Sequence, residues 1–389
     1  MDEPTFPPMD RHASTFSCPN LSCPRWGQRG TGNIVHRSWT GTDRHIERLR
    51  CTTCGQEFSE RRGTLMARSK LPEETVERLL KCQRWGGCDA GTADIWGVDI
   101  KTVHRFQKVA AQRAQAHHEQ VTQDLRVAGV QLDEMHTKLR RRRVEWLHTA
   151  LAMGSLFLLW VHWGPRTQES AALLIAQVVA RLGGVPVWLS DGWKAYPAAL
   201  LQVLGRVYQR RRRGRRGPHP KPRLVPPQDL FYGQVVKVRD RRGKLLRVVS
   251  RVVYGGPRRF ITEMASRGLR PSIQTAFMER WYGTLRGLCA PLRRRTRCGS
   301  SSPSRHHARV WLVVDLYNFV LPHKSLRQQG RPCTPAMAIG LAKHVWSDRD
   351  YLAQTQHSCH QPPTRKSHDS CEALTHAPLW PGSDRRSVD

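Results

Sequence analysis

The segment 185–196, VPVWLSDGWKAY, decides the interpretation of the fold. Its apolar first half predicts a short buried strand, which ends at Asp191. The segment 129–135, GVQLDEM, repeats this pattern and carries Asp133 near the end of a second apolar strand. Carboxylates beside apolar strand residues are informative in a chain as basic as this one. We therefore expect both aspartates at the edge of one central sheet.

Outward from these segments, strands and helices alternate along the chain. The expected strands cover residues 127–135, 144–151, 156–163, 185–189, 234–238 and 245–254, and the expected helices cover 170–182, 273–288 and 308–319. This order favours an α/β domain over 125–330, with helices packed on a sheet. A basic insert, QRRRRGRRGPHPKPRLVPP at 209–227, interrupts it and cannot build a core. We expect a helical extension over 331–352, and disorder in the leader, 1–17, and the tail, 353–389.

The composition points to a polyanion as the partner of this protein. The chain has 389 residues, with 64 Lys+Arg against 31 Asp+Glu and a formal net charge of +33. This charge excludes the surface of an ordinary metabolic enzyme and favours nucleic acid. A hydrophobic fraction of 39% is enough for real cores, and the length predicts two or three compact units.

No membrane span or export signal is visible in the sequence. The most apolar stretch, 150–163, is shorter than the roughly 20 apolar residues that a membrane helix needs. The first residues lack the basic and apolar regions of a secretory signal. We therefore expect a cytoplasmic protein without membrane contact.

Four cysteines in two close pairs predict a metal site near the amino terminus. Cys18 and Cys23 form one pair, and Cys51 and Cys54 form the other. Two tight turns of this kind present four thiolates tetrahedrally to one ion, which suits Zn²⁺ better than hard cations. Because the unit at 18–62 is small, metal binding should contribute much of its folding free energy.

A helix-turn-helix is predicted within a helical region over 70–120. In the segment 91–114, GTADIWGVDIKTVHRFQKVAAQRA, Gly97 permits a turn between two helices, and Asp99 can cap the second one. The outward positions, which would meet base edges and phosphates, are Lys101, Thr102, His104 and Arg105. The alternative is an ordinary helical hairpin with a solvated basic face.

Three carboxylates predict metal-dependent phosphoryl transfer. Asp133 and Asp191 lie on predicted strands, and Glu279 lies on the predicted helix that begins near 273, away from its apolar face. Two Mg²⁺ ions acting on nucleic acid need one carboxylate that bridges both ions and two more that each hold one. One ion activates the attacking oxygen, and the other stabilises the leaving oxygen. Glu134 is the alternative to Asp133, because a shift of one residue in the pleat turns the adjacent acid to the site.

The order of these motifs resembles a known family. After the cysteine unit and the helix-turn-helix come Leu-Asp-Glu-Met, Ser-Asp-Gly-Trp-x-Ala-Tyr, Glu-Arg-x4-Leu-Arg and Tyr-Asn-x3-Pro-His. This order is similar to that of bacterial insertion-sequence DDE transposases of the small-element type, which have an amino-terminal zinc ribbon. The likeness runs from 18 to about 352, and its most specific pieces are 189–200, 277–286 and 315–327.

The resemblance implies a ribonuclease-H-like catalytic core preceded by a zinc ribbon and a helix-turn-helix domain. It also implies a divalent metal, Mg²⁺ or Mn²⁺, and cut-and-join chemistry at terminal inverted repeats in double-stranded DNA. By position, the three carboxylates match the catalytic residues of the family. Lys194, Arg280 and Arg286 match basic positions that contact DNA. Synapsis of two element ends implies a homo-oligomer on DNA, in a nucleoid-associated protein.

The chain departs from the family pattern in two places. Tyr282 stands where the family usually has Asn, and the segment 297–309 is far more polar than the helical connection of the family. We predict a DDE transposase that cleaves and joins DNA strands with two divalent metals. The alternative is a catalytically inactive DNA-binding remnant or a transcriptional regulator. A third class, a basic RNA-binding protein, finds no support in the carboxylate pattern.

Overall fold

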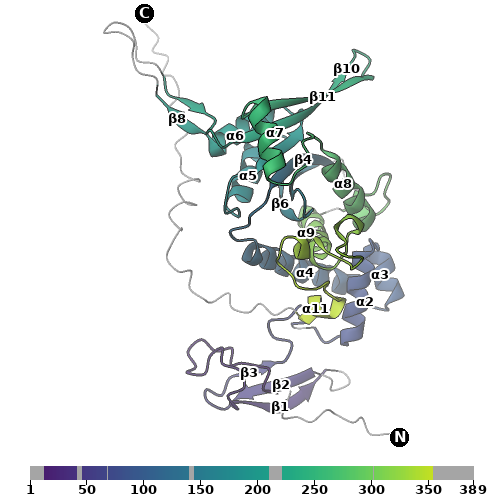
Figure 1. Cartoon of the computed structure of the whole chain (residues 1–389). Helices are drawn as coiled ribbons and strands as arrows, with labels where there is room; N and C mark the ends of the chain where they lie inside the picture. The colour runs from purple at the N-terminus through teal and green to yellow at the C-terminus, as the bar shows by residue number, and fades with distance from the viewer. Residues whose placement is uncertain are drawn as a thin grey trace, which may run out of the picture.

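The computed structural model describes residues 13–41, 46–67, 69–139, 144–209, 221–300 and 302–353 (Figure 1). Most of the expected leader and tail, and 210–220 of the basic insert, lie outside the described residues. Within the described part of the chain, no helix has both the length and the apolar character needed to cross a membrane.

A mixed six-stranded sheet forms the centre of the fold, in the order β11-β10-β7-β4-β5-β6. Its strands are β4 (Gly129–Lys138), β5 (Val144–Ala152), β6 (Leu158–Gly164), β7 (Val187–Asp191), β10 (Phe231–Arg239) and β11 (Leu245–Tyr254). The first three form an antiparallel meander, and β7 and β10 run parallel to β4. At one edge, β11 pairs antiparallel with β10. The chain therefore has a mixed α/β fold.

Helices cover both faces of this sheet. On one face, α5 (Gln168–Val179) and α6 (Ala195–Leu204) pack together over the core that contains Trp188. On the other face, Leu189 packs with Phe260 of α7 (Pro257–Ser266), and α8 (Ala276–Leu288) lies against β4. Burial on both faces explains why the residues of β7 form a continuous apolar run.

Two smaller groups of elements precede the sheet in the chain. The strands β1 (Ile34–Thr40), β2 (Ile46–Cys51) and β3 (Glu57–Ser59) form a separate antiparallel sheet with its own small core. The helices α2 (Glu73–Arg84), α3 (Asp89–Ile95) and α4 (Ile100–Val121) follow, and α4 packs along α9 (Pro303–Phe319). Shorter elements include the β8–β9 pair (Arg206–Tyr208 and Arg223–Val225), α10 (Pro335–Ala338) and α11 (Asp348–Ala353).

The strands and helices expected around the central sheet are present, and they differ from the predictions at their ends. The strand β4 runs on to Lys138, because its last residues pair with the start of β5. The sequence did not predict α7 or the small sheet of β1, β2 and β3. The extension at 331–352 is helical only in the short segments α10 and α11.

The polar segment at 297–309 supplies the first turns of α9, which begins at Pro303 rather than at 308. Its Arg309 is buried and donates to the carboxylate of Asp89 and to the carbonyl of Gly87. The amide of Gln107 in α4 donates to the same carboxylate at 2.6 Å. The polar side chains of this segment therefore fasten α3 and α4 to α9.

Replacement of Arg309 by Ala should destabilise the chain by about 1.5–3 kcal/mol, because a carboxylate and a carbonyl lose their charged donor. Urea unfolding followed by circular dichroism measures this change. The matched control is Arg270→Ala, which removes an exposed arginine and should change stability by less than about 0.5 kcal/mol. Equal midpoints for the two variants would contradict a structural role of the polar segment.

Candidate functional site

Three carboxylates converge where the neighbouring strands β4 and β7 carry their acidic residues. Leu132 of β4 pairs with Ser190 of β7, so the next residues, Asp133 and Asp191, lie side by side on the same face of the sheet. Carboxylate oxygens of Asp133, Glu134 and Asp191 all lie within 4.8 Å of one another. Oxygen ligands at this spacing could hold a divalent metal ion.

The structure brings Glu134 into the group together with Asp133. Successive strand residues point to opposite faces, and Gln131, on the same face as Asp133, bonds the carbonyl of Gln274 just before α8. Glu134 leaves β4 on the other face, and its oxygens accept hydrogen bonds from Arg166 at 2.6 and 2.9 Å and from the hydroxyl of Tyr196 at 2.8 Å. Its carboxylate still lies within 4.8 Å of both aspartates. From the sequence, Glu134 is an alternative to Asp133, whereas in the structure both acids belong to the carboxylate group.

Burial makes the charged form of this group costly. It raises the pKa of Asp133 to about 8, and the nearby charges of Glu134 and Asp191 add to the effect. Burial also raises the pKa of Asp191, although the backbone N–H of Trp193 and the cations Arg166 and Lys237 oppose the shift. A bound cation would offset the repulsion among these carboxylates.

Glu279, the third carboxylate predicted from the sequence, lies outside this group. Its side chain on α8 is 61% exposed and bonds the ammonium of Lys237 on β10 at 3.1 Å. Its charge still contributes to the raised pKa of Asp133. Its partner Lys237 lies two residues after Val235, which pairs with Asp191, so this contact is on the same face of the sheet as Asp191. The structure therefore joins two of the three predicted residues closely and holds the third nearby.

The sequence did not identify Arg166 as part of this site. Its guanidinium lies between the rings of Trp146 and Trp193, at 5.0 and 4.9 Å from their centroids, while it donates to Glu134. Arg166 follows β6, far from both acidic segments along the chain. No spacing pattern could reveal it, because sheet packing alone brings the three segments together.

The predicted DNA-contact residues near the carboxylates lie at the surface. Lys194 is exposed at the start of α6, and Arg280 is exposed on α8 beside Glu279. Arg286, in the last turn of α8, is half-buried. The side chain that stands in the Asn position of the family, Tyr282, is buried, and burial and the charge of Asp133 raise the pKa of its hydroxyl.

The predicted helix-turn-helix segment has the expected local geometry. Gly97 adopts a φ of +58°, and the carboxylate of Asp99 caps α4 by accepting the backbone N–H of Lys101 at 2.6 Å. Two of the predicted contact residues, Lys101 and Arg105, are exposed, and Thr102 is half-buried. His104 instead turns to Asp89, with its Nε2 at 3.3 Å from that carboxylate, so it belongs to the contact between α3, α4 and α9.

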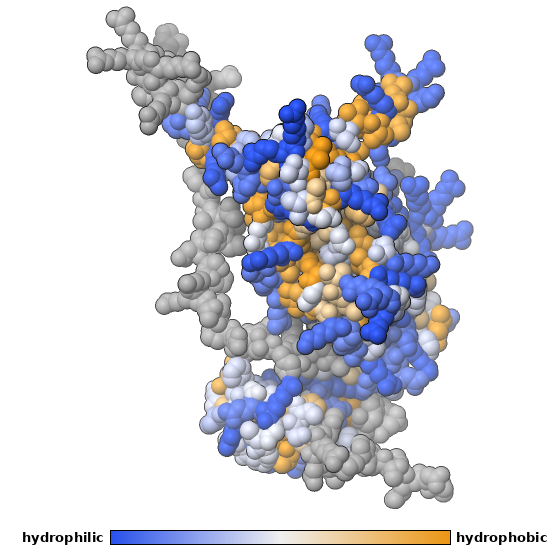
Figure 2. Space-filling view, viewed as in Figure 1, coloured by the Kyte–Doolittle hydropathy of each residue, from blue (hydrophilic) through white to orange (hydrophobic). Residues whose placement is uncertain are grey.

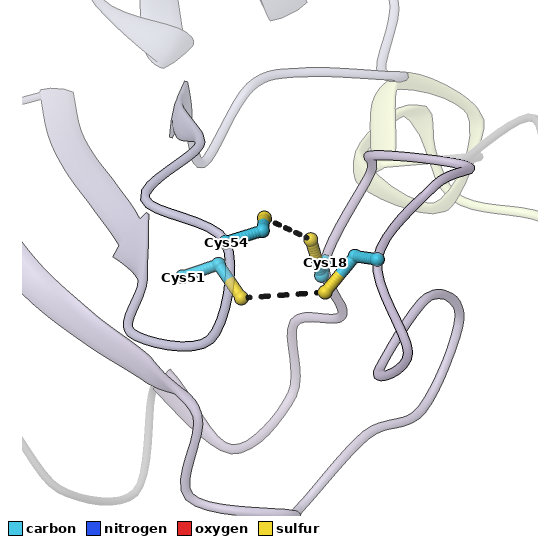
Figure 3. A group of neighbouring side chains, drawn as sticks. Cys18, Cys51 and Cys54 are labelled. Atoms are coloured by element: carbon cyan, nitrogen blue, oxygen red, sulfur yellow. Dashed lines mark hydrogen bonds between the residues drawn. The ribbon is translucent and has the colours of Figure 1, made fainter.

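The four cysteines near the amino terminus also converge. Figure 3 shows sulfurs from separate loops pointing toward one another. The Sγ atoms of Cys18 and Cys54 are 3.5 Å apart, those of Cys23 and Cys51 are 3.9 Å apart, and all four lie within 4.8 Å of one another. This cluster could hold a metal ion that prefers sulfur ligands.

The pKa values of the four thiols diverge: burial raises those of Cys18 and Cys23, whereas hydrogen-bond donors lower those of Cys51 and Cys54. Burial would raise the pKa of Cys51, but backbone N–H groups of Cys54 and Thr53 and the amide of Asn33 outweigh it and lower this pKa to about 6. The Asn33 amide donates to the sulfur at 3.2 Å. Because metals bind the thiolate form, these donors favour metal binding at neutral pH.

No protein-family model matches the chain, and no curated protein sequence matches it. The function therefore has to be inferred from the two clusters of potential metal ligands and from the cations around them.

The carboxylate group predicts a specific pH dependence of stability. In the absence of metal, Asp133 keeps its proton up to about pH 8 when folded, but the unfolded chain releases it above about pH 4. The free energy of unfolding should therefore fall as the pH rises between these values, by about 1.4 kcal/mol for each unit of pKa shift.

Urea unfolding of the wild type and of Asp133→Asn at pH 5, 7 and 8.5 checks this expectation. The fall with pH should be smaller in Asp133→Asn, and added Mg²⁺ should stabilise only the wild type at pH 8.5. If the two proteins show the same pH dependence and the same response to Mg²⁺, the carboxylates do not form a coupled metal site.

The cysteine cluster predicts a metal-dependent fold for 13–67. Replacement of Cys51 by Ser should remove the bound transition metal and expose this segment to proteolysis, because the small core cannot stabilise it alone. Elemental analysis and limited proteolysis measure the two effects. Cys298→Ser, at an exposed cysteine outside the cluster, should retain metal and resistance. A fully folded, metal-free Cys51→Ser protein would contradict a structural metal.

Proposed function

We propose that the chain is a DDE-type DNA transposase, which binds the terminal inverted repeats of an insertion sequence and catalyses DNA cleavage and strand transfer. The observation that carries the proposal is the convergence of Asp133 and Asp191, with Glu134 beside them, within 4.8 Å at a sheet that carries exposed cations. These acids come from segments far apart in a chain of charge +33. A carboxylate cluster on a surface that attracts DNA suits metal-dependent phosphoryl transfer.

The strand order supports the ribonuclease-H-like core that the sequence resemblance implied. Three antiparallel strands are followed by two that run parallel to the first, in the order β6-β5-β4-β7-β10. The aspartates lie on the two adjacent central strands, β4 and β7. Adjacent strands in this register could present two carboxylates to one phosphodiester.

In this proposal, Asp133, Asp191 and Glu279 hold a pair of Mg²⁺ or Mn²⁺ ions. Ions bound there would activate the attacking oxygen and stabilise the leaving oxygen. Glu279 faces the same side of the sheet as the aspartates, and it would have to exchange its contact with Lys237 for the metal site. Glu134 acts as a positioning residue, because Arg166 and Tyr196 already occupy its oxygens.

The amino-terminal elements would position the chain on DNA. In this proposal the four cysteines hold Zn²⁺ in a zinc ribbon, and α3 and α4 form a helix-turn-helix. Lys101 and Arg105 are exposed on α4 and would contact the duplex. Because several cations would neutralise phosphates, binding should weaken steeply with salt.

A non-catalytic DNA-binding remnant is the second candidate function. Two observations favour it: Glu279 lies outside the carboxylate group, and Tyr282, which stands in the Asn position of the family, is buried. This candidate retains the cysteine cluster and the exposed cations, and it assigns no reaction to the aspartates.

An assay of strand cleavage and transfer distinguishes the two candidates. The substrate is duplex DNA that ends in candidate inverted repeats taken from the flanks of the gene, with Mg²⁺ or Mn²⁺. Wild-type protein should expose a 3′-hydroxyl and join it to a target strand. Asp191→Ala should lose more than about 100-fold of this activity while it still binds the duplex, because changes even in the outer shell of metal sites cost about 10–100-fold.

One control variant and two further variants test which acid is the third metal ligand beside Asp133 and Asp191. Asp229→Ala, which removes an exposed acid outside the site, should keep full activity. Glu279→Gln should resemble Asp191→Ala, whereas Glu134→Gln should lose only about 10–100-fold. If the wild type binds the repeats but is as inactive as Asp191→Ala, the chain is a DNA-binding remnant.

A further inference from the structure

The strands β10 and β11 extend beyond the rest of the sheet as a two-stranded ribbon. Pairing of β10 with β7 ends where Val235 meets Asp191, but its pairing with β11 continues to Arg239 and Leu245. Figure 1 shows this ribbon projecting away from the body of the molecule. We call residues 236–249 the β10–β11 arm.

The surface of the arm carries many cationic side chains, together with three exposed apolar ones, Leu245, Leu246 and Val248. The exposed cations are Lys237, Arg239, Arg241, Arg242, Lys244 and Arg247. The one acid of the arm, Asp240, shapes the turn, because its carboxylate accepts the backbone N–H groups of Arg242 and Lys244 at 2.9 and 2.8 Å. Figure 2 shows the hydrophilic tip as a blue protrusion. The arm therefore presents a concentrated positive charge on a stable hairpin.

The arm starts at the carboxylate group and points away from it. Val235 is the neighbour of Asp191 across β10 and β7, and the turn at Asp240 lies farther along β10 in the same direction. A strand rises about 3.3 Å per residue, so the turn lies roughly 17 Å beyond the carboxylates. This distance corresponds to about five base pairs of duplex DNA, at about 3.4 Å per pair.

We propose that the β10–β11 arm lies in a groove of duplex DNA, about five base pairs from the phosphate held at the carboxylates. The inference rests on the proposed function for the presence of DNA at Asp133 and Asp191. The major groove, about 12 Å wide, admits a two-stranded β-ribbon. Charge complementarity selects DNA over a second copy of the chain, because two arms of this charge repel each other.

The first test compares the salt dependence of DNA binding in two variants of the full chain. One variant carries Arg241→Gln, Arg242→Gln and Lys244→Gln in the turn of the arm. The matched control carries Arg126→Gln, Arg258→Gln and Arg270→Gln, which remove the same charge from exposed positions near the opposite ends of β4 and β11. Fluorescence anisotropy follows binding to a 40-bp duplex from about 50 to 300 mM salt.

The arm variant should reduce the slope of log K against log[salt] by about 2–3, since each lost phosphate contact removes about 0.9. The control should keep the wild-type slope. Equal slopes for the two variants would overturn the proposal. A wild-type slope together with a change from dimer to monomer in sedimentation would overturn it in favour of a subunit contact. A larger loss of affinity for structured RNA than for the duplex would overturn it in favour of RNA.

A second variant tests the arm independently, in case the three substitutions in its turn disturb the local fold. An Asn-Gly turn can replace 239–246, because Val238 and Arg247 are cross-strand partners and a two-residue turn can join them. Hydroxyl-radical footprinting should then lose protection at one end of the site, about five base pairs from the phosphate that Asp191→Ala leaves uncut. Unchanged protection would contradict the proposed position.

The salt-dependence test needs neither metal nor cleavage, so the two proposals can fail separately. If the arm substitutions reduce the salt slope but the wild type cuts no DNA, the proposal for the arm stands and the proposal of a transposase is wrong. If the wild type cuts DNA but the arm substitutions leave the salt slope unchanged, the proposal of a transposase stands and the proposal for the arm is wrong.

Discussion

The parallel pairing of β4 with β7 is the constraint on which the candidate site depends. The register that joins Leu132 to Ser190 sets the next two residues, both aspartates, side by side on one face. A slip of one residue would turn one of these carboxylates to the opposite face. Apolar residues on both faces of β7 prevent such a slip, because it would exchange buried Trp188 and Leu189 between two different cores.

The same pairing has an electrostatic cost. Three carboxylates within 4.8 Å repel one another, and burial raises the pKa of each. Arg166 offsets part of this repulsion, because its flat guanidinium lies between two tryptophan rings and donates to Glu134. The remaining repulsion centres on Asp133, which has no cationic partner in the described structure. A site arranged in this way gains stability from a divalent cation.

The helices before the sheet are tied to it through polar contacts with α9. His117 of α4 lies 3.1 Å from the buried carboxylate of Asp315, and Arg309 reaches Asp89 at the start of α3. These contacts cross between segments about 200 residues apart. They hold α3, α4 and the sheet in one packed unit. In the proposed function, DNA bound by α4 would therefore have a defined position relative to the carboxylates.

Local patterns in the sequence were sufficient for the strands of the central sheet, for the helices around it other than α6 and α7, for the cap at Asp99 and for the paired cysteines. These features depend on periodicity or short spacing, which neighbouring residues determine directly. The partners of Glu134, the contact of Glu279 with Lys237 and the burial of Arg309 came only from the tertiary structure. In each of these, packing joins side chains from distant segments, and no local pattern encodes which segments will meet.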